Sequence, residues 1–329
     1  MGCETMKNDE FLSFTALLTR LTPSQKKKLA GELNTQASRE EGIQLIESRV
    51  GEAVKCPHCS HGEVMKYGFV DDLQRYKCKS CRKSFNALTG TPLARLRDKN
   101  KLLAYAETMK NGLSLRKAAK ECGIHLDRAF RWRHKFLSLP EKQQAKILSG
   151  IAEADETFVL NSKKGSRELG RKPRKRGTKA TKRGLSDEYV CVLVARDRTG
   201  ATLDAVMPHL TKSVLTEVLA PALDKDTMLC SDGSPVYKSF VKAEGIAHTV
   251  LNGAAGIRVI DKVFHIQNVN AYHSRFKEWL GQFHGVASKY LPNYLGWRRL
   301  IEKNQGVSFS AQEILQAALG NPCHYLTRT

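Results

Sequence analysis

The spacing of apolar residues changes near residue 150. Before that point, outside one cysteine-rich stretch, apolar side chains recur at the three- and four-residue intervals of an amphipathic helix. Residues 5–50 are predicted to be helical, because FLSFTALLTRL shows this spacing. The stretch Thr22-Pro23-Ser24-Gln25 adds an N-cap, a proline at the first helical position and a capping-box glutamine. Nothing in this segment suggests chemistry, so packing or dimer contacts are its expected role.

A second helical stretch covers residues 98–137 and contains a break. Its helices are expected to begin near Ser114 and near Asp127, with Gly123 in the turn between them. Glycine suits a sharp turn because it adopts left-handed backbone conformations at little cost. The pattern predicts a helix-turn-helix, whose second helix carries an apolar stripe for the core and an adjacent basic stripe. The basic residues are Arg128, Arg131 and Lys135.

Beyond a linker expected at Leu139–Gly150, strands alternate with helices. Three strands come first, and Arg198-Thr199-Gly200 joins the second and third as a hairpin. This order predicts a ribonuclease H-like fold, a mixed sheet flanked by helices. The expected strands are Ile151–Val159, Glu188–Asp197, Ala201–Met207, Thr227–Asp232 and Ala247–Asn252, and the expected helices are Ser213–Leu223, Val236–Gly245 and a final one at Ile266–Gln282.

The net charge of +21 is concentrated in two segments. Residues 55–137 hold 19 basic and 7 acidic groups (+12), residues 163–183 hold 11 and 1 (+10), and the rest of the chain sums to −1. Such blocks predict two surfaces that contact a polyanion, whereas charge kept for solubility would be spread evenly. No stretch resembles a signal peptide or a membrane span, and the nine cysteines suit a reducing compartment. A cytoplasmic protein with no membrane partner is expected.

Four cysteines form two C-x-x-C pairs with eighteen residues between them: Cys56, Cys59, Cys78 and Cys81. This spacing fits a four-thiolate zinc site. A short hairpin at Lys66–Phe69 and Gln74–Lys77 would bring the two pairs together. His58 and His61 are alternative ligands but are expected to be exposed. Because a closed four-cysteine site is structural, Zn²⁺ is predicted to stabilise this small fold and to take no part in catalysis.

Two aspartates of the predicted sheet are expected to converge, since carboxylates at the strand ends of such a sheet meet. Asp155 lies on the first strand, in EADETFV, and Asp232 closes the fourth, in LCSDGSPVY. Two acids a few ångströms apart bind divalent cations, and paired Mg²⁺ ions support phosphoryl transfer. Glu153 shares a strand face with Asp155 and is a candidate further ligand, whereas Glu156 is expected on the opposite face.

These motifs together resemble the ISXO-like group of bacterial insertion-sequence transposases of the DDE superfamily, which carry an N-terminal zinc ribbon. The resemblance covers about residues 50–300. It rests on C-P-x-C…C-x-x-C followed by F…TGTPL, on EADETFV and SDGSPVY, and on HIQNVNAYHSRFKEWLGQFHGVASKYLPNYLGWRR. It implies that Asp155 and Asp232 are the first two catalytic carboxylates and that Mg²⁺ or Mn²⁺ is the catalytic ion.

The third catalytic position of the family falls on the final predicted helix, at Asn270. Relatives use Glu, Asn or His there, so Asn270 departs from an acidic triad but stays within the family's range. Its amide oxygen is a neutral ligand, which should lower metal affinity. Lys277, two helical turns later, matches the family's basic residue and is expected to contact a DNA phosphate. His273 and Glu278 stay open as alternative third ligands.

The segment Lys163–Arg183 is expected to be a flexible loop that grips DNA phosphates without reading sequence. Together with the basic stripe of the second helix, it supplies the predicted DNA contacts. Its candidates are Arg171, Lys172, Arg174, Lys175 and Arg176.

The sequence therefore predicts a multidomain transposase that acts on double-stranded DNA, at element ends and target, as a nucleoid-associated homo-oligomer. One alternative is a non-catalytic or domesticated DNA-binding protein, and another is a structure-selective nuclease. Terminal inverted repeats flanking the gene would favour the transposase. The expected domains are an N-terminal helical segment (1–50), a zinc ribbon (51–90), a helix-turn-helix domain (91–140), a catalytic domain (148–302) and a C-terminal tail (303–329).

Overall fold

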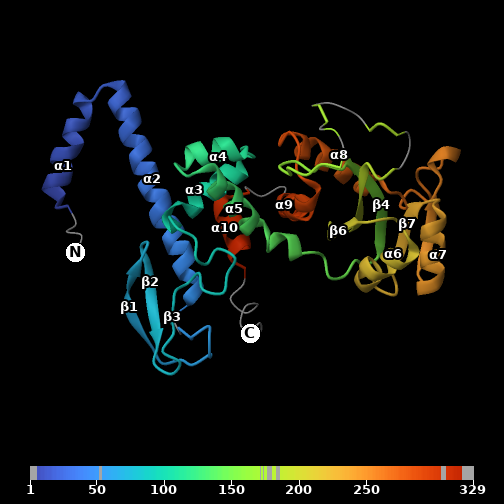
Figure 1. Cartoon of the computed structure of the whole chain (residues 1–329), viewed down its shortest axis with the longest axis horizontal. Coiled ribbons are helices and arrows are strands. Elements are labelled where there is room, and N and C mark those ends of the chain that lie inside the picture. Colours follow the sequence, from blue (N-terminus) through green and yellow to red (C-terminus); the bar gives the residue numbers. More distant parts are fainter. Residues whose placement is uncertain are drawn as a thin grey trace. The chain divides into compact units, whose positions relative to one another are not determined.

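A computed structural model describes most of the chain, which divides into two compact units (Figure 1). The first unit comprises Met1–Asn111 and Asn321–Thr329, and the second comprises Gly112–Gly320. The described residues are 6–51, 54–170, 172, 174–175, 180–182, 186–304 and 309–320. Within these ranges, no helix has the length and apolar character needed to cross a membrane.

The first unit contains three helices and a small antiparallel sheet among its described residues. They are α1 (Asn8–Leu17), α2 (Pro23–Glu47), β1 (Val64–Val70), β2 (Leu73–Cys78), β3 (Ser84–Phe85) and α3 (Leu102–Lys110). The predicted capping box is confirmed at α2, where Gln25 N donates to Thr22 Oγ1 and Thr22 N donates to Gln25 Oε1. The predicted hairpin is also confirmed. Its turn residues, Asp71 and Asp72, both have positive φ, as a two-residue hairpin turn requires.

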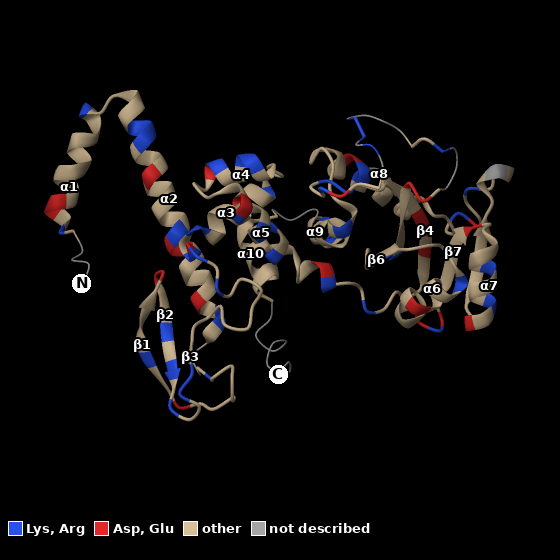
Figure 2. Cartoon of the chain, viewed as in Figure 1, with Lys and Arg blue, Asp and Glu red and all other residues tan. Residues whose placement is uncertain are grey.

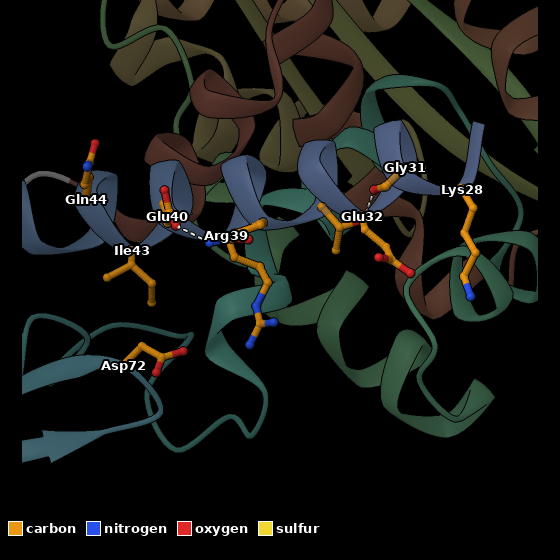
Figure 3. A pocket seen from close by; sticks show the side chains of 10 residues that line it. Lys28, Gly31, Glu32, Arg39, Glu40, Ile43, Gln44 and Asp72 are labelled. Atoms are coloured by element: carbon orange, nitrogen blue, oxygen red, sulfur yellow. Dashed lines mark hydrogen bonds between the residues drawn. The ribbon is translucent and has the colours of Figure 1, made fainter. Parts of the chain in front are cut away.

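A groove of about 930 Å³ runs along α2 in the first unit (Figure 3). It is lined by charged side chains of both signs, by small or polar residues and by Ile43, and none of them was predicted to carry chemistry. The lining residues are Lys28, Gly31, Glu32, Thr35, Gln36, Arg39, Glu40, Ile43, Gln44 and Asp72.

The second unit is built on a five-stranded mixed sheet of order β6-β5-β4-β7-β8. In this sheet β5 pairs antiparallel with both β4 and β6, and β7 and β8 run parallel to β4. Every predicted strand lies within one residue of its expected bounds. The strands are β4 (Ile151–Leu160), β5 (Tyr189–Asp197), β6 (Thr202–Met207), β7 (Met228–Asp232) and β8 (Ala247–Leu251).

Helices cover both faces of this sheet, because β5 alternates its apolar side chains between them. Cys191, Leu193 and Ala195 pack in one core with α6 and α7, while Val192 and Val194 pack in the other with α8 and α9 (Figure 1). The result is the predicted ribonuclease H-like arrangement of a mixed sheet and flanking helices. These helices are α6 (Lys212–Val218), α7 (Pro235–Glu244), α8 (Gln267–Gly281) and α9 (Leu291–Lys303).

Two helices, α4 (Leu115–Glu121) and α5 (Leu126–Leu137), lie at the positions predicted around the Gly123 turn, where φ is +57°. The apolar stripe of α5 is buried, as expected, and α5 packs on α9 and α10 (Ala311–Leu319). The contacts therefore divide the chain inside the range 91–140, which the sequence assigned to one domain. The reason is that α3 packs on α2, whereas α4 and α5 pack on helices of the second unit.

The helices α9 and α10 were not predicted, and α10 lies inside the segment expected to be a tail. Its start is a capping box in which Glu313 N donates to Ser310 Oγ and Ser310 N donates to Glu313 Oε2. Ile314 and Leu315 are buried. The S-x-x-E signal before an apolar run was present in the sequence and indicated a helix start.

Candidate active site

The pairing of β4 with β7 brings the two predicted aspartates to the same place. The parallel register sets Ile151 opposite Met228 and Glu153 opposite Cys230. Two residues further along both strands, this register leads to Asp155 and Asp232. Asp232 ends β7, and its Oδ1 accepts a hydrogen bond from Ser234 N (3.0 Å), just before α7 begins. The carboxyl ends of parallel strands are the usual place for a site in an open α/β sheet.

The two carboxylates repel each other in a partly buried setting. Burial and, to a smaller extent, the charge of Asp232 raise the pKa of Asp155 to about 6, while a hydrogen bond from the backbone of Glu156 and the charge of Lys277 oppose the shift. No lysine or arginine of the described chain lies within ion-pairing distance of either carboxylate. The pair is therefore short of positive charge.

Three polar residues of α8, Asn270, His273 and Lys277, share one face of the helix by their spacing, and His273 is the one that reaches the pair. His273 is buried and its Nδ1 lies 3.8 Å from Asp155 Oδ2. Burial lowers the pKa of His273 to about 4, with a further contribution from Lys277, and its Nε2 has no hydrogen-bond partner in the described part of the chain. Asn270, one turn earlier on the same face, is exposed, and so is Lys277. The predicted alternative Glu278 is exposed as well.

Glu156 also belongs to this cluster, although it points to the other face of β4. Tyr237 of α7 donates a hydrogen bond from its hydroxyl to Glu156 Oε1. Burial raises the pKa of Glu156 to about 7, and the charges of Asp155 and Asp232 add to the rise. Sequence reasoning missed Tyr237. Its position in SDGSPVY, five residues after Asp232, was the available signal.

Glu153 is not free to act as the further metal ligand suggested by the strand pattern. It is fully buried, and its Oε1 accepts from Arg198 Nη1 and from Asn268 Nδ2 (2.9 Å). Its Oε2 accepts from Val269 N (3.0 Å). Glu153 therefore caps the N-terminus of α8 from a neighbouring strand, where a negative charge also meets the positive end of the helix dipole.

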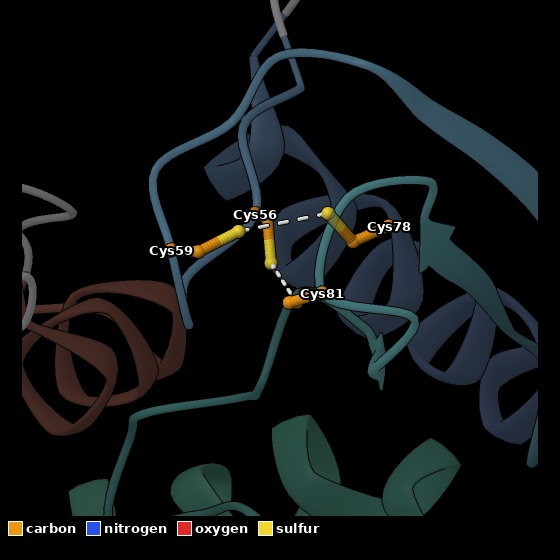
Figure 4. A group of neighbouring side chains, drawn as sticks. All are labelled: Cys56, Cys59, Cys78 and Cys81. Atoms are coloured by element: carbon orange, nitrogen blue, oxygen red, sulfur yellow. Dashed lines mark hydrogen bonds between the residues drawn. The ribbon is translucent and has the colours of Figure 1, made fainter.

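The four predicted cysteines come together in the first unit (Figure 4). Their Sγ atoms all lie within 4.8 Å of one another, with 3.6 Å separating Cys56 from Cys81 and Cys59 from Cys78. Tetrahedral Zn²⁺ with bonds of about 2.3 Å places its sulfur ligands about 3.8 Å apart. The cluster therefore fits a closed four-thiolate zinc site.

The predicted DNA-contacting residues fall into different settings. Arg131 and Lys135 are exposed on α5, and Arg128 is half-buried. Lys172 and Lys175 are exposed, whereas Arg171 and Arg176 lie outside the described residues. Figure 2 shows lysines and arginines on elements of both units, interspersed with acidic residues.

Arg174, predicted as a DNA contact, makes contacts within the protein. Its Nη2 lies 2.7 Å from Glu188 Oε1, and its Nη1 donates to Asn161 O (2.8 Å). Hydrogen bonds from Arg174, Thr181 and Lys182 lower the pKa of Glu188 to about 2, with the backbone of Lys182 as the largest cause. Arg174 therefore ties the basic segment to the ends of β4 and β5.

The fold and the carboxylate pair define a ribonuclease H-like catalytic domain. Residues 147–298 match the family described as ISXO2-like transposase domain. A relative from Halobacterium salinarum, "Uncharacterized protein in transposable element ISH50", is 27% identical over 255 residues, covering 76% of this chain and 86% of the relative. Residues 147–298 therefore resemble an ISXO2-like transposase domain, and the two matches together support an insertion-sequence transposase of the ISXO-like group, a class of DNA-cleaving enzymes that use divalent metal ions.

Two solved structures show a partial likeness to the chain. One is a simian T-cell lymphotropic virus intasome in complex with PP2A regulatory subunit B56 gamma, with a TM-score of 0.28 and 11% identity, covering 59% of this chain and 67% of that chain. The other is a pre-cleavage Mos1 transpososome, with a TM-score of 0.21 and 8% identity, covering 63% of this chain and 78% of that chain.

Proposed function

We propose that this transposase binds the ends of its insertion sequence in double-stranded DNA, cleaves them and joins them to target DNA, with Asp155, Asp232 and Asn270 as its metal-binding residues. One observation carries the proposal: the parallel register of β4 and β7 brings Asp155, in the middle of β4, beside Asp232, at the end of β7, with Lys277 near enough to alter the pKa of Asp155.

The surroundings of the carboxylate pair fit a divalent cation. Both acids are half-buried, they repel each other, and no lysine or arginine in the described ranges pairs with them. The oxygens of Asp155, Asp232 and Asn270 would hold Mg²⁺ or Mn²⁺, whose preferred ligands are oxygen atoms. Bound there, such ions activate an attacking oxygen and stabilise the leaving one.

The remaining residues bind and orient DNA. Lys277 is proposed to contact the phosphate near the scissile bond, and the exposed bases of α5, Arg131 and Lys135, to enter a groove of the element end. Lys172 and Lys175 would add sequence-independent phosphate contacts. The four-cysteine cluster is proposed to hold one structural Zn²⁺. We expect the protein to act as a homo-oligomer on DNA in the cytoplasm, associated with the nucleoid.

His273 is a second candidate for the third ligand position, because it is the α8 side chain that reaches Asp155. We assign the position to Asn270, because the resemblance places the family's third residue there and because its exposed amide shares the face of His273 and Lys277.

The test is incubation of purified protein with labelled duplex from the terminal inverted repeat and Mg²⁺ or Mn²⁺. Wild type should yield nicked and joined products. Asp155→Asn and Asp232→Asn should bind the duplex as wild type does but should give no product, since each removes a charge that the cations require. Wild-type protein that binds the ends and never nicks them would support the non-catalytic alternative.

A further inference from the structure

The inner face of α5 is fixed to the catalytic domain by a buried arginine. Arg133 is 1% exposed, and its guanidinium carbon lies 5.3 Å from the ring centroid of Trp297 and 6.0 Å from that of Phe283. Its Nη2 donates to Leu113 O (2.8 Å), just before α4. Burying a guanidinium costs free energy unless it is hydrogen-bonded and stacked. Because Arg133 has both kinds of contact, we interpret it as a specific contact between α5 and the catalytic domain.

The rings that receive Arg133 connect α5 to α8, the helix of the candidate active site. Trp279 of α8 lies 5.1 Å from Trp297 of α9 and 5.0 Å from Phe283, between centroids. Phe283 in turn lies 5.1 Å from Tyr294. This aromatic cluster is formed by the part of the long family-like motif that follows Asn270 and Lys277.

A second contact lies along the same interface. His134 of α5 stacks on Tyr290 with 4.0 Å between centroids, and Phe130 meets the same ring edge-on at 5.4 Å. Asn293 Nδ2 lies 3.2 Å from His134 Nδ1. α5 is therefore held through Arg133 and through its neighbour His134, side chains that leave the helix about 100° apart, and this restrains the rotation of α5 as well as its distance from α9.

The segment after α5, predicted to be a linker, is also fixed. Arg299 of α9 donates to the carbonyl oxygens of Pro140 (3.0 Å), Glu141 (2.7 Å) and Gln143 (3.3 Å), and it pairs with buried Asp204 of β6. A Cβ on Gly296 would lie 2.5 Å from the Cα of Glu141, so only glycine allows this approach.

The second half of the segment is tied by its backbone to β6 and to the short helix Ala220–Ala222 that follows α6. Ala145 N donates to Thr202 O (3.1 Å), and Leu148 N donates to Ala222 O (2.6 Å). A flexible tether between a DNA-binding helix pair and a catalytic domain would need none of these bonds.

We propose that α4, α5 and the catalytic sheet form one rigid body, in which Arg133 and Arg299 are positioning residues that fix which phosphodiester is cut relative to the DNA bound by α5. This rests on the proposed function, since it needs α5 to contact the element end. The distance between the basic face of α5 and the Asp155–Asp232 pair is then fixed. It sets the position of the cleaved phosphodiester relative to the DNA bound by α5.

The first experiment measures docking without any reaction. Trypsin should cut native protein slowly after Lys142 and Lys146, although both are exposed, because the backbone there is held. Gly296→Ala should displace Glu141, and Arg133→Ala should remove the guanidinium that stacks on Phe283 and Trp297. Each should raise the rate of these cuts at least about tenfold, since proteolysis follows the population of the opened state. Gly281→Ala is the matched control, because a Cβ there meets nothing within 4 Å.

The second experiment maps end cleavage at single-nucleotide resolution in the same proteins. Wild type and Gly281→Ala should cut one phosphodiester, while Gly296→Ala and Arg133→Ala should bind the end but cut several neighbouring positions. Rapid trypsin cutting of the wild-type segment, or a single unchanged cleavage position in both loosened variants, would overturn the proposal. If wild type cuts no DNA, the proposed function fails while the trypsin result still decides whether α5 is docked.

Discussion

Replacing Glu153 with alanine should destabilise the second unit by about 3 kcal/mol. The substitution leaves the buried Val269 N without its acceptor, which costs about 1–3 kcal/mol for an unsatisfied buried donor. It also removes the carboxylate partner of Arg198, whose Nη2 still donates to Val263 O. Because the Arg198 side chain is 28% exposed and can turn to water, we take only about 1 kcal/mol for that loss. Asn268 is exposed and can bond to water instead.

Tryptophan fluorescence during urea denaturation measures this effect in one unit. All three tryptophans, Trp132, Trp279 and Trp297, belong to the second unit. With an m-value of about 3 kcal/mol/M, a loss of about 3 kcal/mol lowers the urea midpoint by about 1 M. Glu153→Gln keeps one acceptor oxygen and should give about half of that shift.

Glu217→Ala is the matched control, because Glu217 is exposed on α6, and it should shift the stability by less than about 0.5 kcal/mol. Since Val269 precedes Asn270, Glu153→Ala should also slow end cleavage at urea concentrations where the unit is still folded. A midpoint for Glu153→Ala equal to that of the control would refute the argument that this carboxylate holds α8.

Three further outcomes are expected. Cys78→Ser should lower the zinc content from about one ion per chain toward zero and weaken end binding, as elemental analysis and titration would show; metal-free protein with full affinity would contradict this. Deleting residues 163–183 should flatten the dependence of log K on log salt while keeping discrimination between end and random DNA, and an unchanged slope would rule out phosphate contacts by this segment. Asn270→Ala should cut poorly, whereas Asn270→Glu should cut at equal or lower Mg²⁺; full activity of Asn270→Ala together with loss in His273→Ala would move the third ligand to His273.

Local signals in the sequence were sufficient for most elements of the fold. The cap at Thr22, the turn at Gly123 and the alternation along β5 each depend on residues close in sequence, so their geometry follows from residue type. The convergence of Asp155 with Asp232 could also be expected, because the order of the elements is that of a ribonuclease H-like sheet.

The partners of buried charges could not be predicted, because they lie far away in sequence. Glu153 and Glu156 are three residues apart on one strand, yet one caps α8 and the other accepts from Tyr237 of α7. Period-two alternation gave their faces correctly. Only the packed structure shows that Glu153 accepts a hydrogen bond from Val269 N, whereas Asp155, the proposed cation ligand, accepts none from that helix end.

The net charge overstates the surface that faces DNA, because several basic residues serve the fold. In the segment 55–137, Lys99 is nearly buried and lies 2.6 Å from Asp71, and Arg133 is enclosed by aromatic rings. In the segment 163–183, Arg174 is paired with Glu188. A count of charges cannot distinguish a structural arginine from a DNA-binding one. A guanidinium that stacks on Trp297 and one that binds a phosphate are both simply arginine in the sequence. The two roles differ in desolvation. A buried cation requires fixed partners and so indicates a contact between elements of the fold, whereas an exposed cation stays hydrated until a polyanion displaces the water.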